Sequence, residues 1–178
     1  MTDPNVPASE AGWPVASLDP IGRARVLAAT IPSAAFHHGV IDAPYDTVWS
    51  WTMDLENSTP RFDSQVDRIV IRRRAEHGDV TEMRIVASSH RLNLPFHVRI
   101  EDGFCMMKGW ARLYLVVMAA VPEDGGERTR FFHMEAIPLR GTGPLRQFIQ
   151  REVDSDFSRL KRLAESGFPE GQSPPGVR

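Results

Sequence analysis

Residues 144–166, PLRQFIQREVDSDFSRLKRLAES, decide the fold of this 178-residue chain. Apolar side chains recur there at spacings of three and four, which predicts one apolar stripe along an α-helix. The stripe consists of Leu145, Phe148, Ile149, Val153, Phe157, Leu160 and Leu163. Pro144 suits the first helical position, and Gly167 suits a left-handed residue after the last turn. Such a helix is roughly 35 Å long, and it needs a broad apolar surface to lie on.

The preceding part of the chain provides that surface as strands. Residues 34–41 are expected to form a first strand, and alternation of period two predicts further strands at residues 66–74, 80–88, 95–101, 105–110, 112–121 and 129–139. Short turns such as Asp102-Gly103 favour hairpins, and therefore an antiparallel sheet. A helical pair, residues 46–55 and a short turn near 61–65, follows the first strand, with Asn57–Pro60 expected to separate the two. The prediction is one α+β domain in which a curved sheet of about six or seven strands wraps around the terminal helix.

The ends of the chain differ from its middle in composition. Residues 1–17 are rich in proline, alanine and serine and are predicted to be disordered, as is the tail at 168–178. Residues 18–32 form a short helical extension that is expected to pack on the outside of the domain. The ligand-binding domain itself is expected to span residues 33–167.

Composition excludes several classes of function. A formal charge of −2 and a pI near 6.3 offer no electrostatic reason to expect nucleic acid. No apolar run approaches the roughly 20 residues that span a bilayer. The single cysteine, Cys105, excludes an internal disulfide and fits a reducing cytoplasm. Histidine and cysteine show no tight ligand spacing, so we expect no metal site. No glycine-rich phosphate loop occurs, and we expect no cofactor. The protein is expected to be a monomer or a homodimer.

Residues 40–49, VIDAPYDTVW, resemble a strand-end phrase of the START-like, helix-grip proteins of the SRPBCC superfamily, in their polyketide cyclase/dehydrase and lipid-transport branch. The phrase MDLEN at 53–57 and the closing helix match the same family. A tryptophan that the family often places after this phrase is replaced here by Ser58-Thr59. The resemblance covers residues 34–166, and its short motifs specify fold better than activity. It implies a hydrophobic cavity between sheet and helix that holds a polyketide, lipid or steroid-like molecule.

His133 and Glu135 are candidate catalytic residues on the last strand. They share one face with Phe131, and alternation alone leaves open whether that face lies inside the domain. Resemblance to the aromatase/cyclase members of the superfamily favours an inward orientation, where the pair would orient a hydroxyl or move a proton. The alternative is a cross-strand polar pair on the solvent face.

His97 and Arg99 are the other two catalytic candidates. Alternation along their strand places Phe96, Val98 and Ile100 inside and both polar residues outside. The aromatase/cyclase resemblance instead implies that Arg99 points into the cavity and polarises substrate carbonyls. Both interpretations stay open at this point.

Ligand-contact candidates are the residues on the expected inner faces of the strands and the terminal helix. They are Tyr114, Val116, Met118, Phe131, His133, Ile149, Val153 and Phe157. The leading hypothesis is a binding protein for a hydrophobic small molecule. One alternative is a polyketide aromatase/cyclase or dehydratase that uses Arg99, His97, His133 and Glu135. Another is a protein-interaction or stress-response module with a collapsed cavity.

Overall fold

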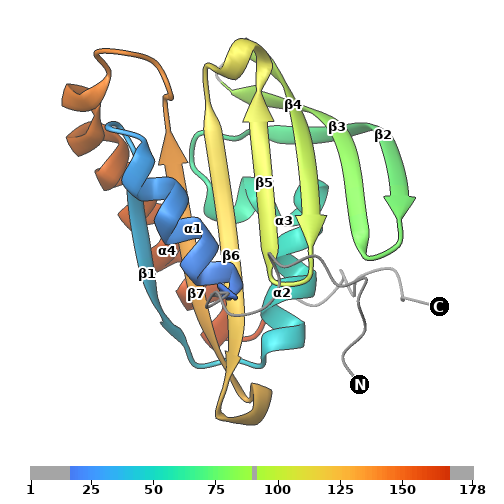
Figure 1. The fold of residues 1–178 in the computed structure, drawn as a ribbon. Coiled ribbons are helices and arrows are strands. Elements are labelled where there is room, and N and C mark those ends of the chain that lie inside the picture. Colours follow the sequence, from blue (N-terminus) through green and yellow to red (C-terminus); the bar gives the residue numbers. More distant parts are fainter. Residues whose placement is uncertain (1–16, 90–91, 169–178) are drawn as a thin grey trace, which may run out of the picture.

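The computed structural model describes residues 17–89 and 92–168 (Figure 1). The main elements are α1 (Pro20–Thr30), β1 (Ala35–Ile41), α2 (Tyr45–Met53), α3 (Leu55–Phe62), β2 (Arg68–His77), β3 (Val80–Ser89), β4 (Leu92–Glu101), β5 (Phe104–Gly109), β6 (Leu115–Glu123), β7 (Arg128–Ala136) and α4 (Arg146–Glu165). Short 3₁₀ turns lie at η1 (Trp110–Arg112), η2 (Asp124–Gly126) and η3 (Gly143–Leu145). Except for Ser17 and Phe168, the two segments expected to be disordered lie outside the described residues.

The seven strands form one antiparallel sheet in the order β1-β7-β6-β5-β4-β3-β2. Strands β2 to β7 lie side by side in the order of the sequence, and only the connection from β1 to β2, through α2 and α3, runs from one edge of the sheet to the other. This confirms the predicted α+β class and the sheet that wraps a terminal helix. Within residues 17–89 and 92–168, no helix combines the length and the hydropathy needed to cross a bilayer.

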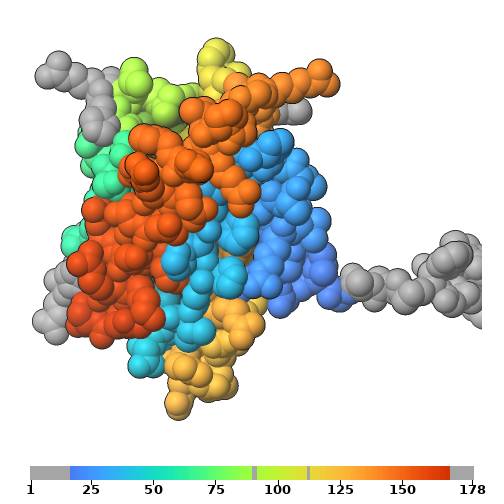
Figure 2. All heavy atoms as spheres, turned by 90° about the vertical axis from the view of Figure 1, so that its left-hand side faces the viewer, coloured from blue at the N-terminus to red at the C-terminus, as the bar shows by residue number. Residues whose placement is uncertain are grey.

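Helices cover both faces of the sheet. Helix α4 lies against β1 and β7 on the inner face, and α1 packs on the outer face of β6 and β7 (Figure 1). In Figure 2 the edge strand β1 is visible between α4 and α1. The sheet therefore separates two apolar cores. The inner core includes Met118, Phe131 and Phe157, whereas the outer core includes Val117 and Phe132.

Two local expectations about helices need correction. Residues 57–60 do not break the helical pair, because α3 runs from Leu55 through Pro60 to Phe62. Leu55, Ser58, Thr59 and Phe62 are buried along one face of α3, so tertiary packing overrides the poor helical propensity of this segment. The hydroxyl of Ser58 donates to the carbonyl of Thr52 at 3.2 Å, which further ties α3 to α2.

Helix α4 also differs from its predicted stripe at the N-terminal end. Leu145 and Phe148 are 44% and 65% exposed, respectively. Ile149, Val153, Phe157 and Leu160 are buried, as the stripe predicts. Asp156 is buried among these apolar residues at 1% exposure, which the pattern did not anticipate. Gly167 has φ +80° directly after the helix, as expected for a left-handed terminating residue.

Candidate functional site

A pocket of about 590 Å³ lies between the inner face of the sheet and the first turns of α4. This volume lies within the usual range for small-molecule sites. Apolar side chains dominate its wall: Val66, Ala87, Leu94, Pro95, Phe96, Trp110, Leu113, Ile137, Leu145, Phe148 and Ile149. The polar members are Asp63, Gln65, Ser89, Asn93, Tyr114, Glu135 and Glu152. The cavity between sheet and helix is therefore not collapsed, so the structure lacks the feature on which the interaction-module alternative depended.

Several large apolar residues of this wall are also exposed to solvent. Trp110 and Phe148 are 71% and 65% exposed, and Leu94, Leu113 and Leu145 are each more than 40% exposed. They come from β4, η1, the loop before β6 and the start of α4, so distant parts of the chain meet at one opening. An apolar opening is an unusual surface for a monomer unless something enters or covers it.

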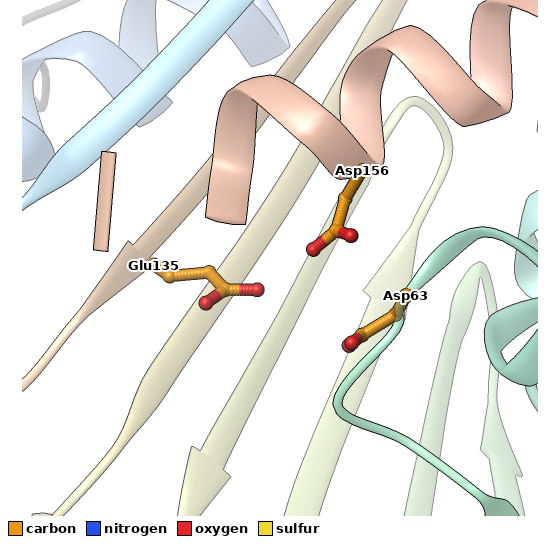
Figure 3. A group of neighbouring side chains, drawn as sticks. All are labelled: Asp63, Glu135 and Asp156. Atoms are coloured by element: carbon orange, nitrogen blue, oxygen red, sulfur yellow. The ribbon is translucent and has the colours of Figure 1, made fainter. Parts of the chain in front are cut away.

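At the inner side of the pocket three carboxylates approach one another (Figure 3). Asp63 follows the last turn of α3, Glu135 lies on β7, and Asp156 lies on α4. One oxygen from each lies within 4.8 Å of the others. Asp63 and Glu135 also line the pocket, so two members of the cluster face the space that a ligand would occupy.

Glu135 contacts two other polar side chains, Tyr114 and His133. The Tyr114 hydroxyl donates a hydrogen bond to its Oε2, and Nε2 of His133 lies 3.4 Å from its Oε1. Burial by itself disfavours charge on both residues of the histidine–carboxylate pair. The hydrogen bond and attraction between them outweigh that penalty, so the pKa of His133 is raised and the pKa of Glu135 is lowered. Each residue of the pair therefore favours the charged form of the other.

The pKa values of Asp63 and Asp156 shift in the opposite direction to that of Glu135. Burial, followed by repulsion from Glu135, raises the pKa of Asp63 to about 6. Burial, followed by repulsion from Asp63, raises the pKa of Asp156 to about 7. Asp63 accepts a backbone hydrogen bond from Gln65 at 2.8 Å, and Oδ1 of Asp156 accepts one from Ser64 at 3.4 Å. Oδ2 of Asp156 is buried without a hydrogen-bond partner.

This arrangement has two chemical capabilities. Carboxylates with pKa values near neutrality suit proton transfer to and from a bound molecule. Three carboxylate oxygens at this spacing also suit a cation, either a hard metal ion or a protonated amine. The sequence offered no metal-ligand spacing, because the three residues belong to separate elements of the fold.

The ligand-contact candidates divide between the pocket and the packed core. Tyr114 and Ile149 line the pocket, as does Glu135 among the catalytic candidates. The other inward residues lie in the adjoining cores rather than on the pocket wall: Val116, Met118, Phe131, Val153 and Phe157. His133 is 3% exposed and meets the ring of Phe62 edge-on at 6.4 Å. Contact of these core residues with a ligand stays a prediction.

His97 and Arg99 do not join His133 and Glu135, which corrects the expectation that Arg99 enters the cavity. Both side chains lie on the outer face of β4 with about half of their surface exposed. Nε of Arg99 donates to Glu101 at 2.8 Å, and Glu82 lies near both residues. The apolar pattern of Phe96, Val98 and Ile100 decided the orientation, because those side chains pack against the inner core.

Asp63 and Asp156 were not recognised from sequence. Asp156 directly precedes Phe157 and stands three residues after Val153, so its position on the buried face of the helix was a usable signal. Asp63 carried no such signal, because it lies in the connection between α3 and β2.

Comparisons with known proteins agree on the fold. No family model matches the chain, and no curated protein matches it significantly in sequence. Among solved structures, an 18 kDa protein of Caulobacter crescentus has a TM-score of 0.60 at 14% identity, covering 75% of this chain and 96% of its own. A protein of Thermus thermophilus has a TM-score of 0.52 at 21% identity, covering 76% of this chain and 99% of its own.

The Zhui aromatase/cyclase of Streptomyces sp. R1128 has a TM-score of 0.51 at 15% identity, covering 74% of this chain and 93% of its own. At these identities the likeness concerns the fold alone. This chain therefore has a helix-grip fold, which is the fold that the resemblance at residues 40–49 implied.

Proposed function

We propose that this protein binds a hydrophobic small molecule in the pocket between the sheet and α4. The observation that carries the proposal is that this pocket has a volume of about 590 Å³ and a wall made mainly of apolar side chains. The exposed side chains of Trp110 and Phe148 mark the opening through which such a molecule would enter. Binding of an apolar molecule to such a wall is favourable, because it removes apolar surface from water.

The test is a thermal-shift screen of the full chain against fatty acids, fatty alcohols, alkyl amines, sterols and aromatic polyketides. A ligand at one hundred times its dissociation constant stabilises the folded state by about 2.7 kcal/mol, which a melting curve resolves. Trp110 gives a second readout, because a ligand at the opening should shift its emission to shorter wavelength. The Trp110→Phe variant should lack this ligand-dependent shift of the emission.

A matched pair of variants on α4 links binding to the pocket. Ile149 lies on the pocket wall at 4% exposure, and Gln147 is exposed two residues earlier on the same helix. Ile149→Trp should fill the pocket and abolish the ligand-dependent shift, whereas Gln147→Trp should retain it. Absence of a shift with every compound in the wild-type chain would refute the proposal, as would equal shifts in the two variants.

A second candidate is an aromatase/cyclase or dehydratase. Asp63, with a pKa of about 6 beside the pocket, favours it, since a carboxyl near neutrality can exchange protons with a bound poly-β-ketone. His133 and Glu135 would then supply the buried charges beside the substrate, and Arg99 and His97 would take no part. Incubation with a poly-β-ketone thioester tests it: Asp63→Asn should slow formation of the cyclised or dehydrated product at least about ten-fold. Equal rates with and without protein would exclude this activity for that substrate.

A further inference from the structure

The charges on the pocket wall are of one sign. Among the described residues that line it, Asp63, Glu135 and Glu152 are acidic and none is a lysine or an arginine. Carboxylates on a mainly apolar wall interact strongly with a bound charge, because little water screens them. A ligand with an anionic head would be repelled there, and a ligand with a cationic head would be attracted.

The cluster has few hydrogen-bond donors. The Tyr114 hydroxyl and Nε2 of His133 both lie against Glu135, whereas Asp63 and Asp156 accept hydrogen bonds from the backbone of Gln65 and Ser64. Oδ2 of Asp156 has no partner, although Asp156 is 1% exposed and its side chain points toward the other two carboxylates (Figure 3). A buried acceptor without a donor destabilises the protein, because the group has lost its water without gaining a partner. A ligand that supplied the missing donor would remove this cost.

The spacing of the oxygens fits a primary ammonium group. Charge-assisted N–H···O bonds are about 2.7–2.9 Å long, and tetrahedral donors at that distance place their acceptors roughly 4.5 Å apart. One oxygen from each of Asp63, Glu135 and Asp156 lies within 4.8 Å of the others. The apolar wall continues from this cluster toward Phe148 and Trp110, so an apolar body attached to the amine has a place to lie.

We propose that the ligand of this pocket is a cationic amphiphile whose protonated amine is held by Asp63, Glu135 and Asp156. The inference rests on the proposed binding function and names the head group that the same site selects. Because a bound ammonium favours ionised carboxylates, binding should strengthen as pH rises from about 5 to about 7.5. The titratable groups that face the amine are Asp63 after α3, Tyr114 before β6, His133 and Glu135 on β7, and Glu152 and Asp156 on α4.

The experiment compares decylamine, decan-1-ol and decanoate by isothermal titration against the full chain at about pH 7.5. Decylamine should bind at least about ten-fold more tightly than decan-1-ol, and decanoate should bind most weakly. The Asp63→Asn/Asp156→Asn double variant should bring decylamine down to the affinity of decan-1-ol and leave decan-1-ol unchanged. Glu82→Gln, which neutralises a carboxylate on the outer face beside Arg99, is the control and should preserve the preference for the amine.

The outcomes separate this inference from the proposed function. If decan-1-ol or decanoate binds as tightly as decylamine, the pocket function stands and the cationic head group is refuted. A preference for the amine that survives in the double variant refutes the role of the cluster. Calcium, magnesium or manganese chloride that binds alone at micromolar concentration and blocks decylamine identifies a metal site instead. If no decyl compound and no member of the lipophile panel binds, the proposed function itself fails.

Discussion

Nε2 of His133 lies 3.4 Å from Oε1 of Glu135, and both residues are buried on the inner face of β7. Their pKa values move in opposite directions, so each residue supports the charge of the other. Taking one partner away leaves a charge in a poorly solvated interior, which costs about 3–5 kcal/mol. This pair therefore connects the stability of the sheet with the electrostatics of the pocket.

His133→Leu should accordingly lower the free energy of unfolding by about 3–5 kcal/mol at neutral pH, as measured by urea denaturation. The matched control is Arg99→Leu. Arg99 also pairs with a glutamate two residues away on its strand, but it does so on the solvent-exposed face. Its loss should cost only about 0–1 kcal/mol. Similar losses in the two variants would show that the interior pair is not ionised.

Asp156→Asn should make the protein more stable at about pH 8, by about 1–3 kcal/mol. The folded state binds a proton at Asp156 more readily than the unfolded chain does, because the pKa rises from its usual value to about 7. The destabilisation by the charged carboxylate is therefore absent below about pH 4, grows as pH rises, and is complete above about pH 7.

Melting temperature measured against pH checks this expectation. The wild-type protein should gain stability relative to the variant as pH falls from about 8 to about 4, where the difference between the two disappears. Glu127→Gln, at an exposed carboxylate just before β7, should leave the wild-type profile unchanged. A less stable Asp156→Asn protein at about pH 8 would contradict the expectation.

Gly39→Ala should destabilise the contact between β1 and α4 by about 1–3 kcal/mol. A Cβ atom at Gly39 would lie 3.1 Å from Cζ of Phe157, whose ring also stacks on His37 at 4.2 Å. Phe157 is 3% exposed, so it has little room to move. Gly143→Ala is the control, because the nearest atom to its added Cβ is 3.9 Å away. Chemical denaturation of both variants should show a loss for the first alone.

Ala24→Glu should destabilise the protein by more than about 2 kcal/mol, because Ala24 of α1 is fully buried against the outer core and offers no partner for a charge there. Ala29→Glu places the same side chain on the exposed side of the same helix and should change stability by less than about 0.5 kcal/mol. Thermal unfolding distinguishes the two. If Ala24→Glu is tolerated, α1 is a detachable extension rather than part of the outer core.

Much of the architecture was accessible from the sequence, since local periodicity reports which side of each element is apolar. The pattern of Phe96, Val98 and Ile100 correctly predicted that His97 and Arg99 face solvent, and the family resemblance misled on that point. For β7 the family resemblance was informative and the alternation was not. Both faces of that strand are apolar because α1 covers one and α4 the other, so alternation could not choose between them. There the resemblance correctly favoured the inward orientation of His133.

By itself the sequence determined the order of the elements, the antiparallel sheet and the terminal helix, because these depend on spacings of two to four residues. Only the tertiary structure decided that Asp63, Glu135 and Asp156 meet beside a pocket and that Phe148 stands at its opening. Those contacts depend on the curvature of the sheet and on the rotation of α4 about its axis. Both are set by packing among residues far apart in the chain, on which periodicity carries no information.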